Sequence, residues 1–212
     1  MTLAGHGGDA SAFSKASMEQ WRRQVEDGVC FLASRCDKVV AVCHSMGCLL
    51  ALGQAERKRV DGLLLLNPPM RIRVRGRVLA NVLKVGLGLT GNDERAQSAI
   101  DAYGVEVDYN PLHYYGWPMR YIELFRESRR IRDMVEKTRL DSLITVVTGG
   151  DDELVSPDSG LCFSRQPFCR VVTLPDAGHY HYSSSDKDVI SGLFTDLIER
   201  VRVGSPFRNS IF

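Results

Sequence analysis

The sequence has no long apolar run and almost no excess of charge of either sign. Its 212 residues include 27 lysines and arginines against 26 aspartates and glutamates, which gives a formal net charge of +1. Binding nucleic acid needs a clustered basic surface, so this balance gives no reason to expect a nucleic-acid partner. No apolar stretch approaches the roughly 20 residues that a membrane-spanning helix needs, and no charged-then-apolar leader opens the chain. We therefore expect a soluble, cytoplasmic protein without a transmembrane segment.

The cysteines show no regular spacing. The six cysteines form no CxxC pair and no spacing typical of zinc ligands. Cys30, Cys43 and Cys48 lie in segments that we expect to be buried. Reduced thiols in the core of a cytoplasmic protein fit this usage, and no metal is expected.

A nucleotide cofactor is also not expected. Residues Gly86 to Gly91 satisfy G-x-G-x-x-G. The motif ends an amphipathic helical pattern, whereas a dinucleotide site needs a strand-to-helix turn that aims main-chain amides at the pyrophosphate. The simpler interpretation is a glycine-rich helix end.

The length is enough for one substantial core and too short to require two domains. We expect a single domain over residues 1–212, because 44% of the residues are hydrophobic and 25% are charged. Within it, residues 70–138 show helical periodicity and no convincing strand, which predicts a helical cap insertion. Residues 1–13 are glycine-rich and contain no strand pattern, and within them residues 3–9 predict a loop. Residues 204–212 predict a loose tail.

Elsewhere, short apolar runs alternate with amphipathic stretches, which indicates an α/β fold with a mostly parallel sheet flanked by helices. Residues 61–67 form a run that is apolar on both faces, as is typical of the middle of a parallel sheet. The expected strands lie within 38–44, 61–67, 143–148 and 170–174, and the expected helices at 18–34, 46–57, near 157–165 and from Asp186 onward.

The chain is organised around a strand, a sharp turn and a helix over residues 38–52. The turn, Cys43-His44-Ser45-Met46-Gly47, matches the nucleophile elbow G-x-S-x-G at the serine and the second glycine, with cysteine in place of the first glycine. Such a turn projects the serine hydroxyl away from the backbone. The alternative is an ordinary loop in which Ser45 is a helix N-cap.

Two later loops carry further polar groups in a consistent order. Gly149-Gly150-Asp151-Asp152-Glu153-Leu154-Val155 follows one expected strand, and Gly178-His179 follows the next. Serine, then aspartate, then histidine is the chain order of the α/β-hydrolase triad. A serine hydroxyl is a weak nucleophile near neutral pH, so it needs a base within hydrogen-bond reach and a partner that fixes the tautomer of that base.

On these motifs the chain resembles α/β-hydrolases of the group that contains carboxylesterases, monoacylglycerol lipases and serine-aminopeptidase-like hydrolases. The resemblance covers nearly the whole chain in order. Besides the elbow, it is carried by Leu3-Ala4-Gly5-His6-Gly7, which is similar to the family loop Leu-Pro-Gly-His-Gly, by Asn67-Pro68-Pro69, by residues 151–156 and by Gly178-His179.

The resemblance implies that Ser45 is the nucleophile, His179 the general base and Asp152 the carboxylate that orients the imidazole, with the amide of Met46 in the oxyanion hole. Asp152 is preferred to Asp151 because it has the family spacing. The competing histidine is His181, which lies between two tyrosines and is expected to pack or to lie on a loop surface. His6 and His44 are expected to be structural or to support the catalytic side chains from behind, and His113 is expected at the surface.

In one respect the sequence departs from the family pattern. Members of the family have further strands before the segment that corresponds to residue 1, and one of these strands leads into a loop that supplies a second oxyanion amide. We therefore expect Met1 to be an internal methionine of a longer hydrolase. Loss of one donor typically costs roughly 10²–10³ in turnover, so weak activity is expected. Residues 39–42 would then form an exposed apolar edge through which copies could pair into a homo-oligomer.

The function that follows from the resemblance is hydrolysis of a carboxylic ester, small or lipid-like, through an acyl-enzyme on Ser45. The alternative is a catalytically impaired hydrolase fragment that acts as a binding or interaction module. Acyl and alcohol specificity, and the choice among ester, thioester and amide, are not encoded in a readable pattern.

Overall fold

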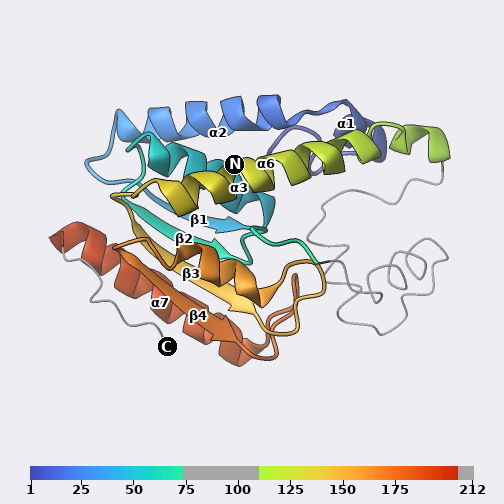
Figure 1. Cartoon of the computed structure of the whole chain (residues 1–212). Coiled ribbons are helices and arrows are strands. Elements are labelled where there is room, and N and C mark those ends of the chain that lie inside the picture. The colour runs from blue at the N-terminus through green and yellow to red at the C-terminus, as the bar shows by residue number, and fades with distance from the viewer. Residues whose placement is uncertain (74–109, 205–212) are drawn as a thin grey trace.

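The computed structural model describes residues 1–73 and 110–204, and its centre is a four-stranded parallel sheet (Figure 1). Each strand pairs in parallel with the next one along the chain, so the order in the sheet is β1-β2-β3-β4. All four carboxyl ends therefore lie at one edge of the sheet, where α/β proteins place their sites. The strands are β1 (Val40–His44), β2 (Gly62–Leu66), β3 (Leu143–Gly149) and β4 (Cys169–Leu174).

Helices cover both faces of this sheet. In Figure 1, α2, α3 and α6 lie on one side of the strands and α7 lies on the other. The 3-10 helix η2 packs with the first group. The bounds are α2 (Met18–Ala33), α3 (Met46–Glu56), α6 (Trp117–Lys137), η2 (Pro157–Phe163) and α7 (Ser184–Val203). The α/β fold with a parallel sheet flanked by helices is confirmed.

Strand β2 shows why both faces are covered. Leu63 and Leu65 lie in the core beneath α3 and α6, whereas Leu64 lies in the core beneath α7. All three are at most 1% exposed. Since alternate residues of a strand point to opposite faces, a run of leucines requires apolar partners on both sides of the sheet.

The first residues are more structured than expected. A short helix, α1 (Ala10–Lys15), follows the loop predicted over residues 3–9, at a place where no helix was predicted. The side chain of Asp9 accepts a hydrogen bond from the amide of Ala12 at 2.7 Å and caps this helix. Trp21 of α2 is only 1% exposed and donates from its indole to the carbonyl of Ala4 at 2.7 Å. The N-terminal loop is thereby fastened to α2.

Two further details differ from the sequence-based prediction. Helix α7 begins at Ser184 and not at Asp186, because Ser183 and Asp186 form a capping box that starts the helix earlier. Cys30 is exposed and not buried, since it lies beside the buried Val29 on an outward-facing part of α2.

The insertion predicted over residues 70–138 is described only at its two ends. Residues 74–109, which include the Gly86–Gly91 motif, lie outside the described residues, as do residues 205–212 of the predicted tail. After the 3-10 helix η1 (Pro111–Tyr114), α6 packs against α2, α3 and η2, and its Ile131 and Val135 are fully buried. This part of the segment belongs to the layer that covers the sheet, and the cap insertion stays a prediction.

Strand β1 is an edge strand, because within the described residues it pairs only with β2. Val42 in this strand is 51% exposed, whereas Val39 just before it is buried. Among the described residues, no helix is both long enough and apolar enough to span a bilayer.

Candidate active site

Ser45 occupies a strained turn between β1 and α3. Its φ of 49° and ψ of −122° lie outside the conformations that a non-glycine residue prefers. Such a residue costs on the order of 1–3 kcal/mol and persists only where the surrounding structure holds it. Here the amide of Ser45 donates to the carbonyl of Leu66 at 2.9 Å, which continues the ladder between β1 and β2, and α3 begins at the next residue.

The side chain of Ser45 does not cap helix α3. Ser45 stands at the N-cap position of α3, yet its hydroxyl makes no capping hydrogen bond. Instead Oγ lies 2.9 Å from Nε2 of His179. The interpretation of Ser45 as a helix cap therefore lacks the contact that defines a cap.

Cysteine at position 43 is compatible with this turn. A Cβ placed on Gly47 would lie 3.9 Å from the Cβ of Cys43, an ordinary van der Waals distance, so the two residues do not crowd each other. Burial raises the pKa of the Cys43 thiol to about 12. Near neutral pH the group is a thiol, and Ser45 has no thiolate beside it.

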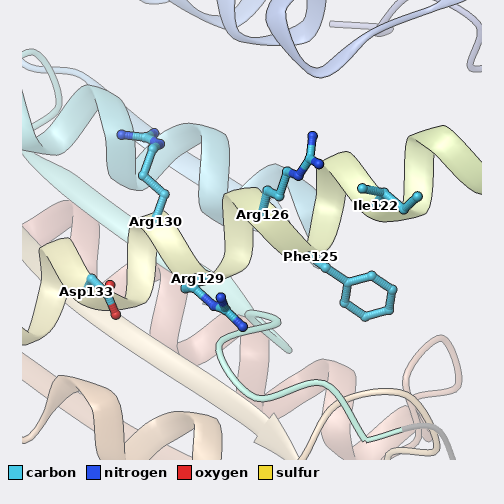
Figure 2. A pocket seen from close by; sticks show the side chains of 6 residues that line it. All are labelled: Ile122, Phe125, Arg126, Arg129, Arg130 and Asp133. Carbon is cyan, nitrogen blue, oxygen red and sulfur yellow. The ribbon is translucent and has the colours of Figure 1, made fainter.

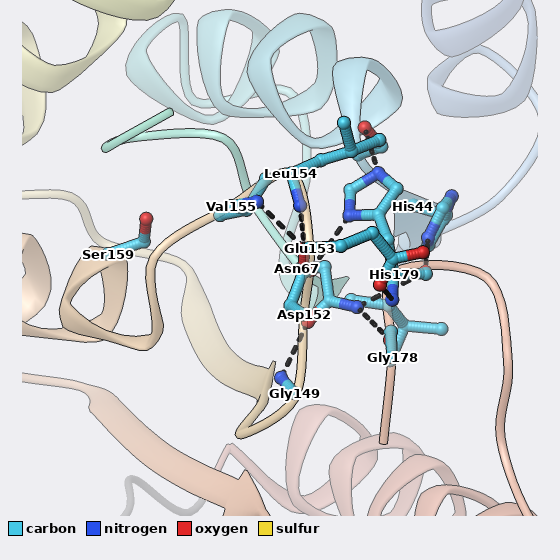
Figure 3. A network of polar contacts seen from close by, with 12 residues as sticks. His44, Asn67, Gly149, Asp152, Glu153, Leu154, Val155, Ser159, Gly178 and His179 are labelled. Carbon is cyan, nitrogen blue, oxygen red and sulfur yellow. Dashed lines mark hydrogen bonds and ion pairs between the residues drawn. The ribbon is translucent and has the colours of Figure 1, made fainter. Parts of the chain in front are cut away.

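Asp152, in the loop after β3, lies against the imidazole of His179. Its Oδ2 is 2.8 Å from Nδ1 of His179, and its Oδ1 accepts hydrogen bonds from the amides of Leu154 at 2.8 Å and Val155 at 2.7 Å (Figure 3). The carboxylate is 1% exposed. Asp151, by contrast, donates from its main-chain amide to the carbonyl of Ala177 at 3.1 Å.

The two contacts of the His179 ring define its tautomer. A buried carboxylate beside Nδ1 places the proton on Nδ1, which leaves Nε2 to accept from the hydroxyl of Ser45. The ring is 1% exposed. His181 contributes through its main chain. Its carbonyl accepts a hydrogen bond from the amide of Gly178 at 3.0 Å and closes the turn that carries His179.

The remaining histidines lie in three different places. His44 is at the site, with Nε2 2.8 Å from the carbonyl oxygen of His179, and burial is the main cause that lowers its pKa to about 4. His6 packs edge-on against Phe13 and Trp21, and burial lowers its pKa as well. His113 lies in η1 outside this group.

Asn67 is a site residue whose position the sequence analysis did not assign to the chemistry. It follows β2 with a φ of 49°, is 1% exposed, and accepts from the amide of Gly149 at 2.7 Å. Its side-chain nitrogen lies near the loop that carries His179. In the sequence, Asn67 stands out as a polar residue between an apolar strand and two prolines. This pattern fits an ordinary turn residue as well as a buried side chain that joins two loops.

Met46 is the first residue of α3, so its amide has no acceptor within the helix. The positive end of the helix dipole adds to the partial charge at this point. An amide directly after the serine can therefore donate to an oxyanion that forms on a carbonyl attacked by Ser45. Together the hydroxyl, the imidazole and the carboxylate can move a proton away from Ser45.

An open groove of about 410 Å³ lies along α6. Figure 2 shows the side chains that line it. The side chains around Ser45 come from the loops that follow the four strands, whereas the described lining of the groove comes from α6 alone. The groove is lined by Ile122, Phe125, Arg126, Arg129, Arg130 and Asp133. Within residues 1–73 and 110–204, no three His, Cys, Asp or Glu side chains are grouped to hold a metal ion.

Comparison with solved structures shows similarity to lipolytic enzymes. A soluble variant of monoglyceride lipase from Saccharomyces cerevisiae, in complex with a substrate analog, is 16% identical with a TM-score of 0.64, over 98% of this chain and 77% of that chain. Monoacylglycerol lipase from Paleococcus ferrophilus is 12% identical with a TM-score of 0.57, over 87% and 76%. A structure described with LipS and LipT, two metagenome-derived lipolytic enzymes, is 12% identical with a TM-score of 0.64, over 93% and 80%.

At these identities the solved structures show a shared fold. No curated protein matches the chain by sequence. The model of the alpha/beta hydrolase family, however, matches residues 1–191, which is most of the chain. The fold, the order of the motifs and this match agree, and the chain therefore belongs to the alpha/beta hydrolase family.

Proposed function

We propose that the protein is a serine hydrolase that cleaves a carboxylic ester through an acyl-enzyme on Ser45. The observation that carries the proposal is the continuous chain of contacts from Ser45 through His179 to Asp152, at 2.9 Å and 2.8 Å. Membership in the alpha/beta hydrolase family supports a hydrolase in general. The ester substrate is the further step that we propose.

In the first half of the reaction, Oγ of Ser45 attacks the ester carbonyl while Nε2 of His179 takes the hydroxyl proton. The amide of Met46 donates to the oxyanion of the tetrahedral intermediate. His179 then returns the proton to the alkoxide that leaves as the alcohol. Asp152 accepts the Nδ1–H throughout and stabilises the imidazolium while it exists.

In the second half, a water molecule attacks the acyl carbonyl, and His179 takes its proton. The second tetrahedral intermediate collapses, the bond between the acyl group and Ser45 breaks, and the proton returns to Oγ. The products are the carboxylic acid and the free serine.

The substrate class that we propose is a small or lipid-like ester. The solved neighbours that are described as monoglyceride lipases and lipolytic enzymes support this choice. A cytoplasmic location is proposed as well, since the six cysteines are free thiols, and reduced thiols are usual in that compartment.

Labelling with a fluorophosphonate probe, read by intact mass, tests the proposal. The wild-type protein should gain one adduct, and Ser45→Ala should gain none. Ser142→Ala is the control, because Ser142 is a buried serine that lies before the start of β3 and donates to the carbonyl of Val60 at 2.6 Å. It should label as the wild type does.

Hydrolysis of p-nitrophenyl butyrate should follow the same pattern, with a loss of more than about 10³-fold in Ser45→Ala. Full labelling of Ser45→Ala would assign the nucleophile elsewhere. A folded wild-type protein that neither labels nor hydrolyses the ester would instead favour the interaction module, with the exposed Val42 of edge strand β1 as the first surface to examine.

A further inference from the structure

Side chains hold both main-chain polar groups of His179. The amide donates to Oε2 of Glu153 over 3.1 Å. The carbonyl oxygen lies 2.8 Å from Nε2 of His44 and 3.2 Å from Nδ2 of Asn67. Figure 3 shows these side chains gathered around His179. They come from the ends of β1, β2 and β3, so three segments of the chain converge on the backbone of one residue.

The position of the loop explains why such support matters. His179 follows the outer strand β4, while Ser45 follows β1, the outer strand on the opposite side of the sheet. Neighbouring strands lie about 4.8 Å apart, so the outer strands are separated by about 14 Å. The loop must therefore cross the ends of β2 and β3 to bring the imidazole to the serine. Asn67 is the residue that follows β2, beneath this crossing.

Asn67 connects the loop that carries His179 to the end of β3, the strand that leads to Asp152. Its Nδ2 lies 3.0 Å from the carbonyl of Gly178 and 2.8 Å from the hydroxyl of Tyr182, in addition to the carbonyl of His179. Its Oδ1 accepts from the amide of Gly149 at the end of β3. One buried amide group thus ties the histidine loop to the strand that leads into Asp152.

His44 holds the same carbonyl from the other side. Because a carbonyl oxygen only accepts, the hydrogen of the neutral His44 ring must be on Nε2. The ring also packs against those of His179 and Tyr180, with centroids 5.0 Å and 5.4 Å apart. The residue before the nucleophile is therefore in contact with the residue that carries the base.

We infer that Asn67 and His44 are positioning residues that hold the carbonyl of His179 and thereby place its imidazole between Asp152 and Ser45. The catalytic meaning of this role rests on the proposed function. Productive geometry requires side chains to be held within about 0.5 Å, and a misplacement of about 1 Å can cost about 10²-fold in rate. A loop that crosses two strand ends needs such anchors.

Four substitutions test the inference in the full-length chain. Asn67→Asp keeps the acceptor for Gly149 but removes the donor, and Asn67→Gly removes the side chain while tolerating the positive φ. His44→Phe keeps a ring in place without the donor. His44→Gln restores a side-chain N–H of similar reach.

The matched control is Gln166→Glu. Gln166 is also a buried amide that bridges main-chain groups, since it accepts from the amide of Leu140 at 2.9 Å and donates to the carbonyl of Thr138 at 2.7 Å. These partners precede β3, at the edge of the sheet opposite the candidate site. The control removes an equivalent donor where no contact with His179 exists.

Two readouts separate positioning from folding. The first is the rate of fluorophosphonate labelling, which should fall about 10–10²-fold in Asn67→Asp, Asn67→Gly and His44→Phe. In His44→Gln and Gln166→Glu it should stay within about threefold of the wild type. The second is the NMR signal of the Nδ1–H of His179, which should be observed in the wild type and in both of these variants. It should be lost or broadened in the other three.

Wild-type labelling rates and an unchanged Nδ1–H signal in Asn67→Asp, Asn67→Gly and His44→Phe would overturn the inference. The same holds if Gln166→Glu loses as much labelling as they do at equal thermal stability. A wild-type protein that does not label at all would remove the proposed function. The NMR comparison would still decide whether Asn67 and His44 hold the ring of His179.

Discussion

The hydroxyl oxygen of Ser45 lies 2.9 Å from Nε2 of His179, although 134 positions separate the two residues in the sequence. They follow the first and last strands of a sheet whose order is β1-β2-β3-β4. Parallel strands bring all their carboxyl ends to one edge, but only the loop after β4 carries the imidazole across that edge. The consequences of this geometry can be measured by substitution.

His179→Ala should lower the rate of fluorophosphonate labelling at Ser45 by about 10²–10⁴-fold, because the hydroxyl loses its base. His181→Ala should change it by less than about threefold, since His181 closes its turn through a main-chain carbonyl that alanine retains. Labelling rates of the purified variants check this. Equal losses from the two substitutions would contradict the assignment of the base.

Asp152→Asn should reduce kcat for an ester substrate by about 10⁴-fold. The amide at position 152 would present N–H to Nδ1 and favour the wrong tautomer of His179. Asp151→Asn should have a small effect, because Nδ1 of His179 is contacted by the carboxylate of Asp152. Steady-state kinetics decide between them, and a greater loss from the Asp151 change would transfer the role.

Gly149→Ala should destabilise the protein by about 1–3 kcal/mol and slow labelling. A Cβ at this position would lie 2.5 Å from the carbonyl oxygen of Ala177, so the loop of His179 must move away from β3. Gly192→Ala is the control, since no atom lies within 4 Å of the added Cβ, and this helical site should gain about 0.5–1 kcal/mol. Urea unfolding measures both, and equal effects would argue against the crowding.

Stability should fall as the pH drops from about 6.5 toward 4, in part through His44. Burial lowers its folded-state pKa to about 4 from 6.5, so within this window the unfolded chain binds the proton more readily and acid favours unfolding. The shift corresponds to at most about 3 kcal/mol. In His44→Gln this component should be absent. Urea unfolding of both proteins at neutral pH and near about pH 5 would show it as a smaller acid-induced loss in the variant.

The sequence by itself determined the class of fold and the chemistry-bearing residues. Four consecutive leucines in 62–66 require cover on both faces of a strand, and the alternation of strands with helices requires a parallel sheet. The motifs named Ser45, Asp152 and His179, and the structure brings these three side chains together. Such features can be predicted from the sequence because each depends only on the periodicity of one element or on the residues of one turn.

Only the tertiary structure decided which groups support that chemistry. Asn67 and Glu153 entered the sequence analysis only as members of family motifs, yet their side chains hold the loop that carries His179. The physical reason is that these contacts join segments far apart in the chain, and they exist only once all four strand ends have been packed against one another at the same edge of the sheet.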